Sequence, residues 1–201
     1  MTAEDTQGDN AKAGNLRDET SLELSPEARR RVAQLGLQAH PEGGFFREVY
    51  RSPGTVIRQG EVRNALTTIY FLLAAGQFSR WHVVASDEVW HFYEGSPLEL
   101  WIYDPELAAK EGDASPSDSL RHVVLGGQVD GASGGSGDSF GERVAVVPAG
   151  CWQAARPLGD YSLVGCTVGP GFDFADFRFV AEDEGHGEPF EGLLAGLDGL
   201  L

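Results

Sequence analysis

Apolar and polar residues alternate in short runs along most of this chain. Between positions 45 and 180, runs rich in Val, Ile, Leu, Phe, Trp and Tyr are separated by Gly, Pro, Asp and Ser. Such runs are typical of strands, and the gaps between them are too short for long helices. The strands we predict are Phe45–Arg51, Ala65–Leu73, Arg80–Val84, Glu88–Glu94, Leu98–Tyr103, Arg121–Leu125, Arg143–Val147, Cys151–Arg156, Tyr161–Val168 and Phe177–Val180. The pattern predicts an all-β antiparallel sandwich or barrel.

One short helix is expected before the strands. Ser25 is a good N-cap, Pro26 suits the first helical position, and Glu27 places an acid in the first turn. Gly36 is a plausible C-cap. We therefore expect a helix that begins after Ser25 and ends near Gly36.

The 201 residues suggest one domain with polar ends. Residues 1–24 lack apolar periodicity and carry six acids against two bases, so we expect a disordered acidic tail. The domain should span 25–181. Residues 182–201 form a second acidic tail that could contain a short helix.

Charge and composition limit the classes of partner that we expect. The formal charge of −16 disfavours binding to nucleic acid or to anionic membranes. No apolar run is long enough to span a bilayer, the N-terminus does not resemble a signal peptide, and two cysteines make no disulfide framework. We expect a cytoplasmic protein whose partner is a small molecule.

Two motifs carry the candidate chemistry. Gly76, His82, Glu88 and Gly95 have the spacing of the first cupin motif, and the segment from Pro148 through Gly150 to Gln153 resembles the second. Further segments resemble one branch, the cupin-5 family: His40–Glu48, Thr68–Leu73, Asp87–Tyr93 and Gly165–Phe177. The resemblance covers residues 33–181. It implies a cupin double-stranded β-helix, or jelly-roll barrel, with a pocket in its mouth, and a homodimer, but no particular reaction.

The chain departs from the metal-binding cupin pattern at two ligand positions. Val84 stands where the second histidine of motif one would be, and Gln153 replaces the histidine of motif two. We therefore expect no cofactor. The alternative is one divalent ion such as Fe, Mn, Ni or Zn, held by His82, Glu88 and Gln153, although an amide is a weak substitute for imidazole.

Without a metal, the same positions suggest acid–base catalysis. His82 would act as the base and Glu88 would support its charged form. The segment Ser79–His82 is distantly similar to that of the dTDP-sugar epimerases, which are cupins that use a histidine base and a tyrosine acid. The acid here could be one of four tyrosines: Tyr50, Tyr70, Tyr93 or Tyr161.

Five further residues are candidates for contacting a ligand. Gln153 occupies a ligand position, and Glu42 lies in the His-Pro-Glu-Gly-Gly segment. Arg47 could bind an anionic group or form a structural ion pair. Asp173 could cap a turn or reach the pocket rim. His91 should face away from Glu88, because side chains alternate along a strand.

Three functions remain open. The first is a metal-independent isomerase or epimerase that acts on a polar, sugar-like carbonyl compound. The second is a metal-dependent cupin oxygenase or isomerase. The third is a cupin that binds a small molecule without catalysis.

Overall fold

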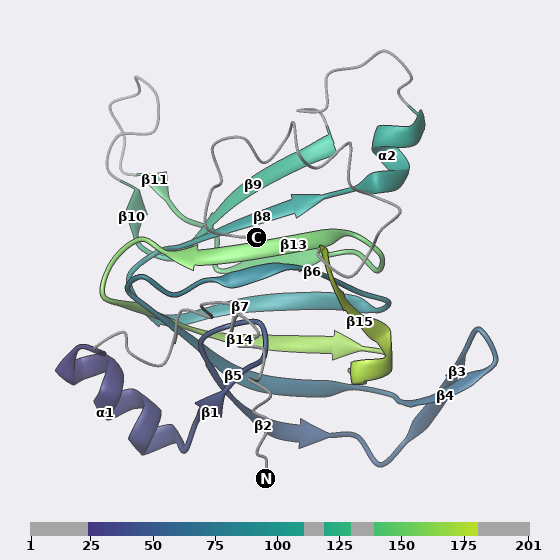
Figure 1. The fold of residues 1–201 in the computed structure, drawn as a ribbon, viewed down its shortest axis with the longest axis horizontal. Coiled ribbons are helices and arrows are strands. Elements are labelled where there is room, and N and C mark those ends of the chain that lie inside the picture. The colour runs from purple at the N-terminus through teal and green to yellow at the C-terminus, as the bar shows by residue number, and fades with distance from the viewer. Residues whose placement is uncertain (1–23, 111–118, 130–138, 181–201) are drawn as a thin grey trace, which may run out of the picture.

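The computed structural model describes residues 24–110, 119–129 and 139–180, and these form two antiparallel sheets packed face to face (Figure 1). The larger sheet has the order β1 (Gln38–Ala39), β2 (Phe45–Arg51), β5 (Thr67–Ala74), β14 (Tyr161–Gly169), β7 (Asp87–Gly95) and β12 (Val144–Val147). The smaller sheet has the order β15 (Phe177–Phe179), β6 (Ser79–Val84), β13 (Trp152–Pro157), β8 (Leu98–Tyr103) and β9 (Leu120–Leu125). Neighbours in each sheet are far apart in sequence, as a jelly roll requires.

Side chains from both sheets fill the space between them. Buried residues alternate with exposed ones along β12, where Ala145 and Val147 point inward and Val144 and Val146 point outward. The inward residues of the two sheets form one apolar cluster, in which Phe71 and Trp90 are the bulkiest buried members. The alternation of apolar and polar residues along the strands thus reflects a single core between two sheets.

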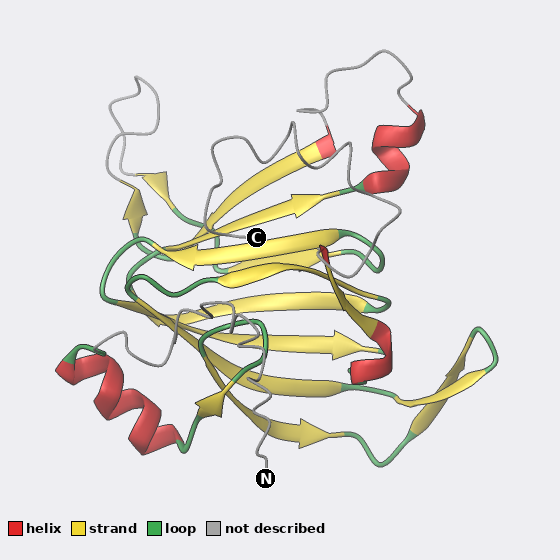
Figure 2. Ribbon diagram, in the orientation of Figure 1, coloured by secondary structure: helices red, strands yellow, loops and turns green. Residues whose placement is uncertain are grey.

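The helix α1 (Pro26–Leu35) lies outside the larger sheet (Figure 2). The Ser25 hydroxyl accepts a hydrogen bond from the Ala28 N–H at 3.1 Å, and Gly36 ends the helix with a φ of 61°. Ala28 packs with Leu72 and Leu163, so the helix covers apolar side chains on the outer face of β5 and β14.

The all-β class, the jelly-roll arrangement and the N-terminal helix are confirmed, and each predicted strand is present with ends within two residues of those expected. The sequence analysis missed β1, two hairpins and a second helix. The hairpins are β3 (Thr55–Arg58) with β4 (Glu61–Asn64), and β10 (Gln128–Val129) with β11 (Ser139–Phe140); the helix is α2 (Pro105–Lys110). The expected acidic tails lie outside the described residues. No helix in the described ranges is long and apolar enough to cross a membrane.

Candidate functional site

A pocket of about 270 Å³ opens at one end of the sandwich, between β2, β5, β14 and β7 on one side and β6 and β15 on the other. Its lining combines buried polar side chains with aromatic and aliphatic ones. The lining residues are His40, Glu42, Phe46, Glu48, Arg51, Thr67, Ile69, His82, Val84, Glu88, Cys166, Val168, Phe172, Asp173, Phe174 and Phe177. This mixture is typical of a small-molecule site, and the volume lies just below the ~300 Å³ at which drug-sized pockets begin.

Strands β6 and β7 deliver the two motif-one residues from opposite sheets. His82 is 2% exposed and Glu88 is 7% exposed, and both line the pocket. Along β7, Glu88 and Trp90 are buried whereas Val89 and His91 are only half-buried. Strand alternation therefore aims Glu88 into the sandwich.

A tight loop between β1 and β2 brings Glu42 to the same place. Gly43 has a φ of 110°, and a Cβ there would overlap the Phe78 carbonyl, so only glycine fits. The loop is closed by a hydrogen bond from the Gly43 N–H to the His40 carbonyl and anchored to β6 by one from the Arg80 N–H to the Glu42 carbonyl, each 3.0 Å long. Glu42 is thereby held 6% exposed at the pocket floor.

Two titratable side chains, His82 and Glu42, lie next to each other at the floor. The His82 Nε2 lies 3.3 Å from the Glu42 Oε2. The His82 Nδ1 lies 2.7 Å from the Arg80 carbonyl oxygen, which can only accept, so Nδ1 carries a hydrogen. When the ring is neutral, Nε2 carries the lone pair, and it is the nitrogen that faces Glu42.

A second chain of hydrogen bonds holds Glu88. The Trp90 indole donates to the Gln153 Oε1 at 2.9 Å, and the Gln153 Nε2 donates to the Glu88 Oε2 at 2.6 Å. An indole N–H is only a donor, so it fixes the orientation of the Gln153 amide. Gln153 is fully buried behind Glu88 and does not line the pocket.

Burial dominates the electrostatics of the floor. It raises the pKa of Glu42 above the ordinary 4.5, although His40 and Arg80 oppose the shift. It also raises the pKa of Glu88, against the opposing effect of His82. Burial lowers the pKa of His82 below 6.5, while the charge of Glu88 opposes this. The neutral forms of all three groups are therefore favoured relative to water.

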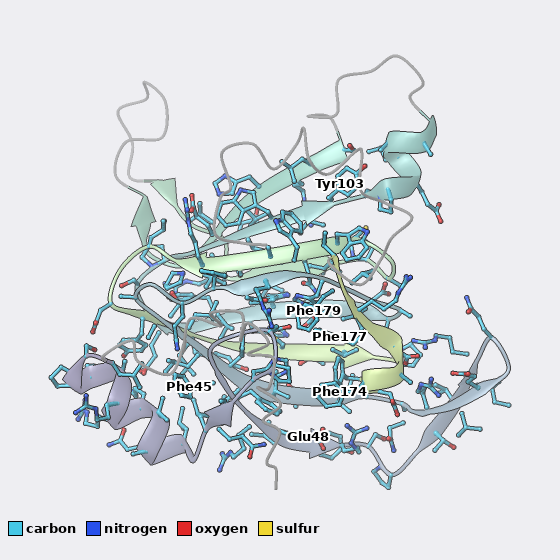
Figure 3. The ribbon with its side chains drawn as sticks, in the orientation of Figure 1. Phe45, Glu48, Tyr103, Phe174, Phe177 and Phe179 are labelled. Atoms are coloured by element: carbon cyan, nitrogen blue, oxygen red, sulfur yellow. The ribbon has the colours of Figure 1, made fainter. Side chains whose placement is uncertain are left out.

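Aromatic side chains form the outer wall. Phe174 belongs to η3 (Phe174–Asp176) and Phe177 to β15. Both line the pocket, as does Glu48 of β2, and all three are labelled in Figure 3. The Phe177 ring also stacks on His82, with ring centroids 5.1 Å apart. Asp173 lines the rim and caps η3, since its side chain accepts from the Ala175 N–H.

Two candidate ligand contacts lie outside this pocket. Arg47 is exposed, with its guanidinium 5.7 Å from the centre of the Tyr70 ring. His91 faces outward from β7, as strand alternation predicted. Neither lines the pocket. Both lie on the outer face of the larger sheet, so the structure does not bring Arg47 and His91 together with His82 and Glu88, and their role as ligand contacts stays a prediction.

The expected tyrosine acid needs correction, because no described tyrosine lines the pocket. Tyr50 is 49% exposed and Tyr93 is 48% exposed. The Tyr161 hydroxyl donates to Glu94, and the Tyr70 ring packs edge-on against Tyr93. A proton donor in this pocket must come from another residue type.

The expected metal ligands do not converge as placed. The Gln153 oxygen accepts from Trp90, and its NH₂ group, which cannot bind a cation, faces Glu88. Within the described ranges, no group of three or more His, Cys, Asp or Glu side chains is arranged to hold a metal ion. The ligand set His82, Glu88 and Gln153 would fit an ion only after the Gln153 amide rotated away from Trp90.

The sequence analysis missed several pocket residues. It did not assign His40 a role, yet His40 lines the pocket and its Nδ1 accepts from the Glu42 N–H at 3.3 Å. Cys166 was not named either; it is buried and hydrogen-bonds Glu88. The aromatic wall was missed too. The signals were the His-Pro-Glu-Gly-Gly segment and the repeated Phe in 172–179.

The two packed sheets and the pocket at their open end define a cupin, and the comparisons agree. Residues 29–180 match the family described as "Cupin superfamily (DUF985)", and the chain belongs to that family.

Two solved structures are similar over most of their length. A hypothetical protein from Leishmania major has 30% identity and a TM-score of 0.66, with 86% of this chain and 95% of that chain covered. A protein from Shewanella oneidensis has 31% identity and a TM-score of 0.62, with 84% and 88% covered. No curated protein sequence matches significantly.

Proposed function

We propose that this cupin binds a compact polar metabolite in the barrel pocket and moves a proton at a carbon next to the metabolite's carbonyl group. The reaction class is isomerisation or epimerisation without a metal. The observation that carries the proposal is the buried contact between the His82 Nε2 and the Glu42 Oε2. Its two members supply a base and an acid side by side in a pocket.

His82 is the base in this mechanism. The Arg80 carbonyl keeps the hydrogen on Nδ1, so Nε2 accepts the proton. As the C–H bond breaks, its electron pair forms the C=C bond of an enol and the carbonyl π pair moves to oxygen. Glu42, whose pKa is raised by burial, gives a proton to that oxygen. In the second half of an isomerisation, His82 returns its proton to the former carbonyl carbon of the enediol. The hydroxyl group on the neighbouring carbon gives its proton to Glu42, and its oxygen becomes the new carbonyl.

Glu88 supports His82 rather than reacting. Its coupling to Gln153 fixes the carboxyl group, and its negative charge, when present, stabilises the protonated imidazole that forms during the reaction. This assignment keeps the expected roles of His82 and Glu88 and moves the acid from tyrosine to Glu42.

Deuterium uptake tests the proposal. The full chain is incubated in D₂O with small aldoses, ketoses and α-hydroxy ketones, and carbon-bound hydrogen is followed by proton NMR. We expect exchange faster than in buffer, reduced about 100-fold or more by His82→Gln or Glu42→Gln. His122→Gln is the matched control, because His122 pairs with Glu99 outside the pocket. Exchange that never exceeds the buffer rate would leave a cupin that only binds its ligand.

A further inference from the structure

Carboxyl groups outnumber guanidinium groups around the pocket. Four carboxyl groups line it, those of Glu42, Glu48, Glu88 and Asp173, against one guanidinium, that of Arg51. An anionic substrate would need a cation or free donors to replace its hydration. Among the described residues that line the pocket, Arg51 is the one arginine, so its contacts decide whether an anion would find free donors.

The Arg51 guanidinium already donates hydrogen bonds to protein oxygens. Its Nε and Nη2 donate to the two Glu48 carboxylate oxygens at 3.0 and 2.7 Å. Its Nη1 donates to the Asn64 Oδ1 at 2.9 Å and to the Phe172 carbonyl at 3.1 Å. Each of its three nitrogens has a partner, so an anion would have to compete with this network.

The apolar part of the lining favours a cation of organic size. The rings of Phe172, Phe174 and Phe177 have centroids 5.1 to 6.3 Å apart and stand at 70–82° to one another. The face of an aromatic ring carries negative charge density and attracts ammonium groups. The wall supplies aromatic rings, and the rim supplies the Asp173 carboxylate. Glu42 and Glu88 at the floor offer carbonyl oxygens as acceptors even in their neutral forms, so wall, rim and floor can all stabilise an ammonium group.

We propose that this pocket selects a compact organic ammonium compound over a carboxylate or phosphate of the same size. The inference extends the proposed function by naming its substrate class, an amine-bearing carbonyl compound rather than a nucleotide sugar. A metal ion fits less well than an organic cation, because in the described part of the chain no three His, Cys, Asp or Glu side chains are arranged to hold one.

Matched probes test the selectivity directly. Benzylamine, benzyl alcohol and benzoate share one ring and differ in charge, and isothermal titration calorimetry of the full chain at neutral pH gives their affinities. We expect benzylamine to bind best and benzoate at least about tenfold more weakly. Benzoate binding as tightly as benzylamine would overturn the proposal, and so would the absence of benzylamine binding.

Two variants test whether the negative charge of Asp173 at the rim contributes to benzylamine affinity, or whether removing any negative charge has the same effect. Asp173→Asn removes one rim charge while asparagine still caps η3. It should weaken benzylamine about threefold and leave benzyl alcohol unchanged. Asp104→Asn is the matched control, since Asp104 also accepts backbone N–H groups, those of Glu106 and Leu107, but outside the pocket. Equal effects of both variants on benzylamine would contradict a role for the rim charge.

Competition distinguishes the two kinds of cation. Zn²⁺ and Mn²⁺ are titrated against the benzylamine complex. Benzylamine binding that persists supports the organic site, and stoichiometric displacement by either ion would overturn it in favour of a metal site. Selective benzylamine binding without deuterium exchange would disprove the proposed chemistry and leave this inference standing.

Discussion

At the scale of single residues, the site depends on which groups hold protons in a buried environment. His82, Glu42 and Glu88 lie together in a space that excludes most water, so ionisation costs more there than at the surface. The Arg80 carbonyl and the Gln153 amide then determine which atoms of His82 and Glu88 face the pocket. The acid–base chemistry that we propose therefore depends both on the burial of these three groups and on the tautomer of His82.

Glu88→Gln should stabilise the protein as the pH rises. Because burial raises the pKa of Glu88 above 4.5, the folded state retains a proton that the unfolded chain releases above that value, so this group lowers stability as pH increases. Glutamine keeps an oxygen for the Gln153 Nε2 and cannot ionise. Urea unfolding from acid to mildly alkaline pH should show the variant gaining about 1 kcal/mol over the parent. A variant less stable at every pH would contradict this account.

The sequence identified part of this site and missed the rest for a physical reason. Motif spacing predicted His82 and Glu88 correctly as neighbours across two strands. It could not show that the Gln153 amide is turned toward Trp90, because that orientation depends on a hydrogen bond from a residue 63 positions away in the sequence. The contact from Glu42 to His82 likewise depends on how a glycine loop docks on β6.

At the scale of elements, the β3–β4 hairpin is held to the body by ion pairs. It extends away from the two sheets (Figure 1). Asp176 of η3 accepts from the Arg63 Nε at 2.8 Å and lies 2.6 Å from the Arg58 Nη2, so both strands of the hairpin are tied to the segment that carries the aromatic wall. The hairpin thereby helps to position Phe174 and Phe177.

Asp176→Asn should loosen this attachment. Hydrogen bonds from Arg63 and charge interactions with Arg58 lower the pKa of Asp176 below 3.8, so its contribution to stability is present above 3.8 and is lost as pH falls through the lower folded value. We expect a loss of about 2 kcal/mol at neutral pH, measured by urea unfolding. The loss should shrink near the acid limit; an equal loss at acid and neutral pH would mean that charge is not the cause.

The sequence predicted the long strands better than the hairpin. A buried strand such as Leu98–Tyr103 can be predicted from its run of apolar residues. In the hairpin, by contrast, Ile57 and Val62 are exposed and the turn lies at Gln59 and Gly60. A Gln-Gly turn lacks the Asn-Gly or Asp-Gly signal, because glutamine seldom adopts the positive φ of 50° that Gln59 shows. Ion pairs with a distant segment override that local preference.

At the scale of the whole molecule, the outer face of the larger sheet has apolar side chains that would suit a second copy. Tyr93 is 48% exposed, Val144 47% and Val146 45%, and strand pairing puts them on one face of β7 and β12. The homodimer expected from the family resemblance stays a prediction, and we propose this face for it. Sedimentation equilibrium should give a dimer that Val144→Glu with Val146→Glu converts to a monomer. A monomeric parent would contradict the proposal.

The most direct test of the acid–base site is the protonation state of His82. Nitrogen-15 NMR of the histidine side chains in the full chain, assigned with His82→Gln, reports tautomer and charge as the pH is lowered. The account predicts that His82 carries its hydrogen on Nδ1 and that more than half of it is neutral at pH 6.5, where half of an ordinary histidine is charged. A ring protonated on both nitrogens at that pH, or a neutral ring with hydrogen on Nε2, would contradict it.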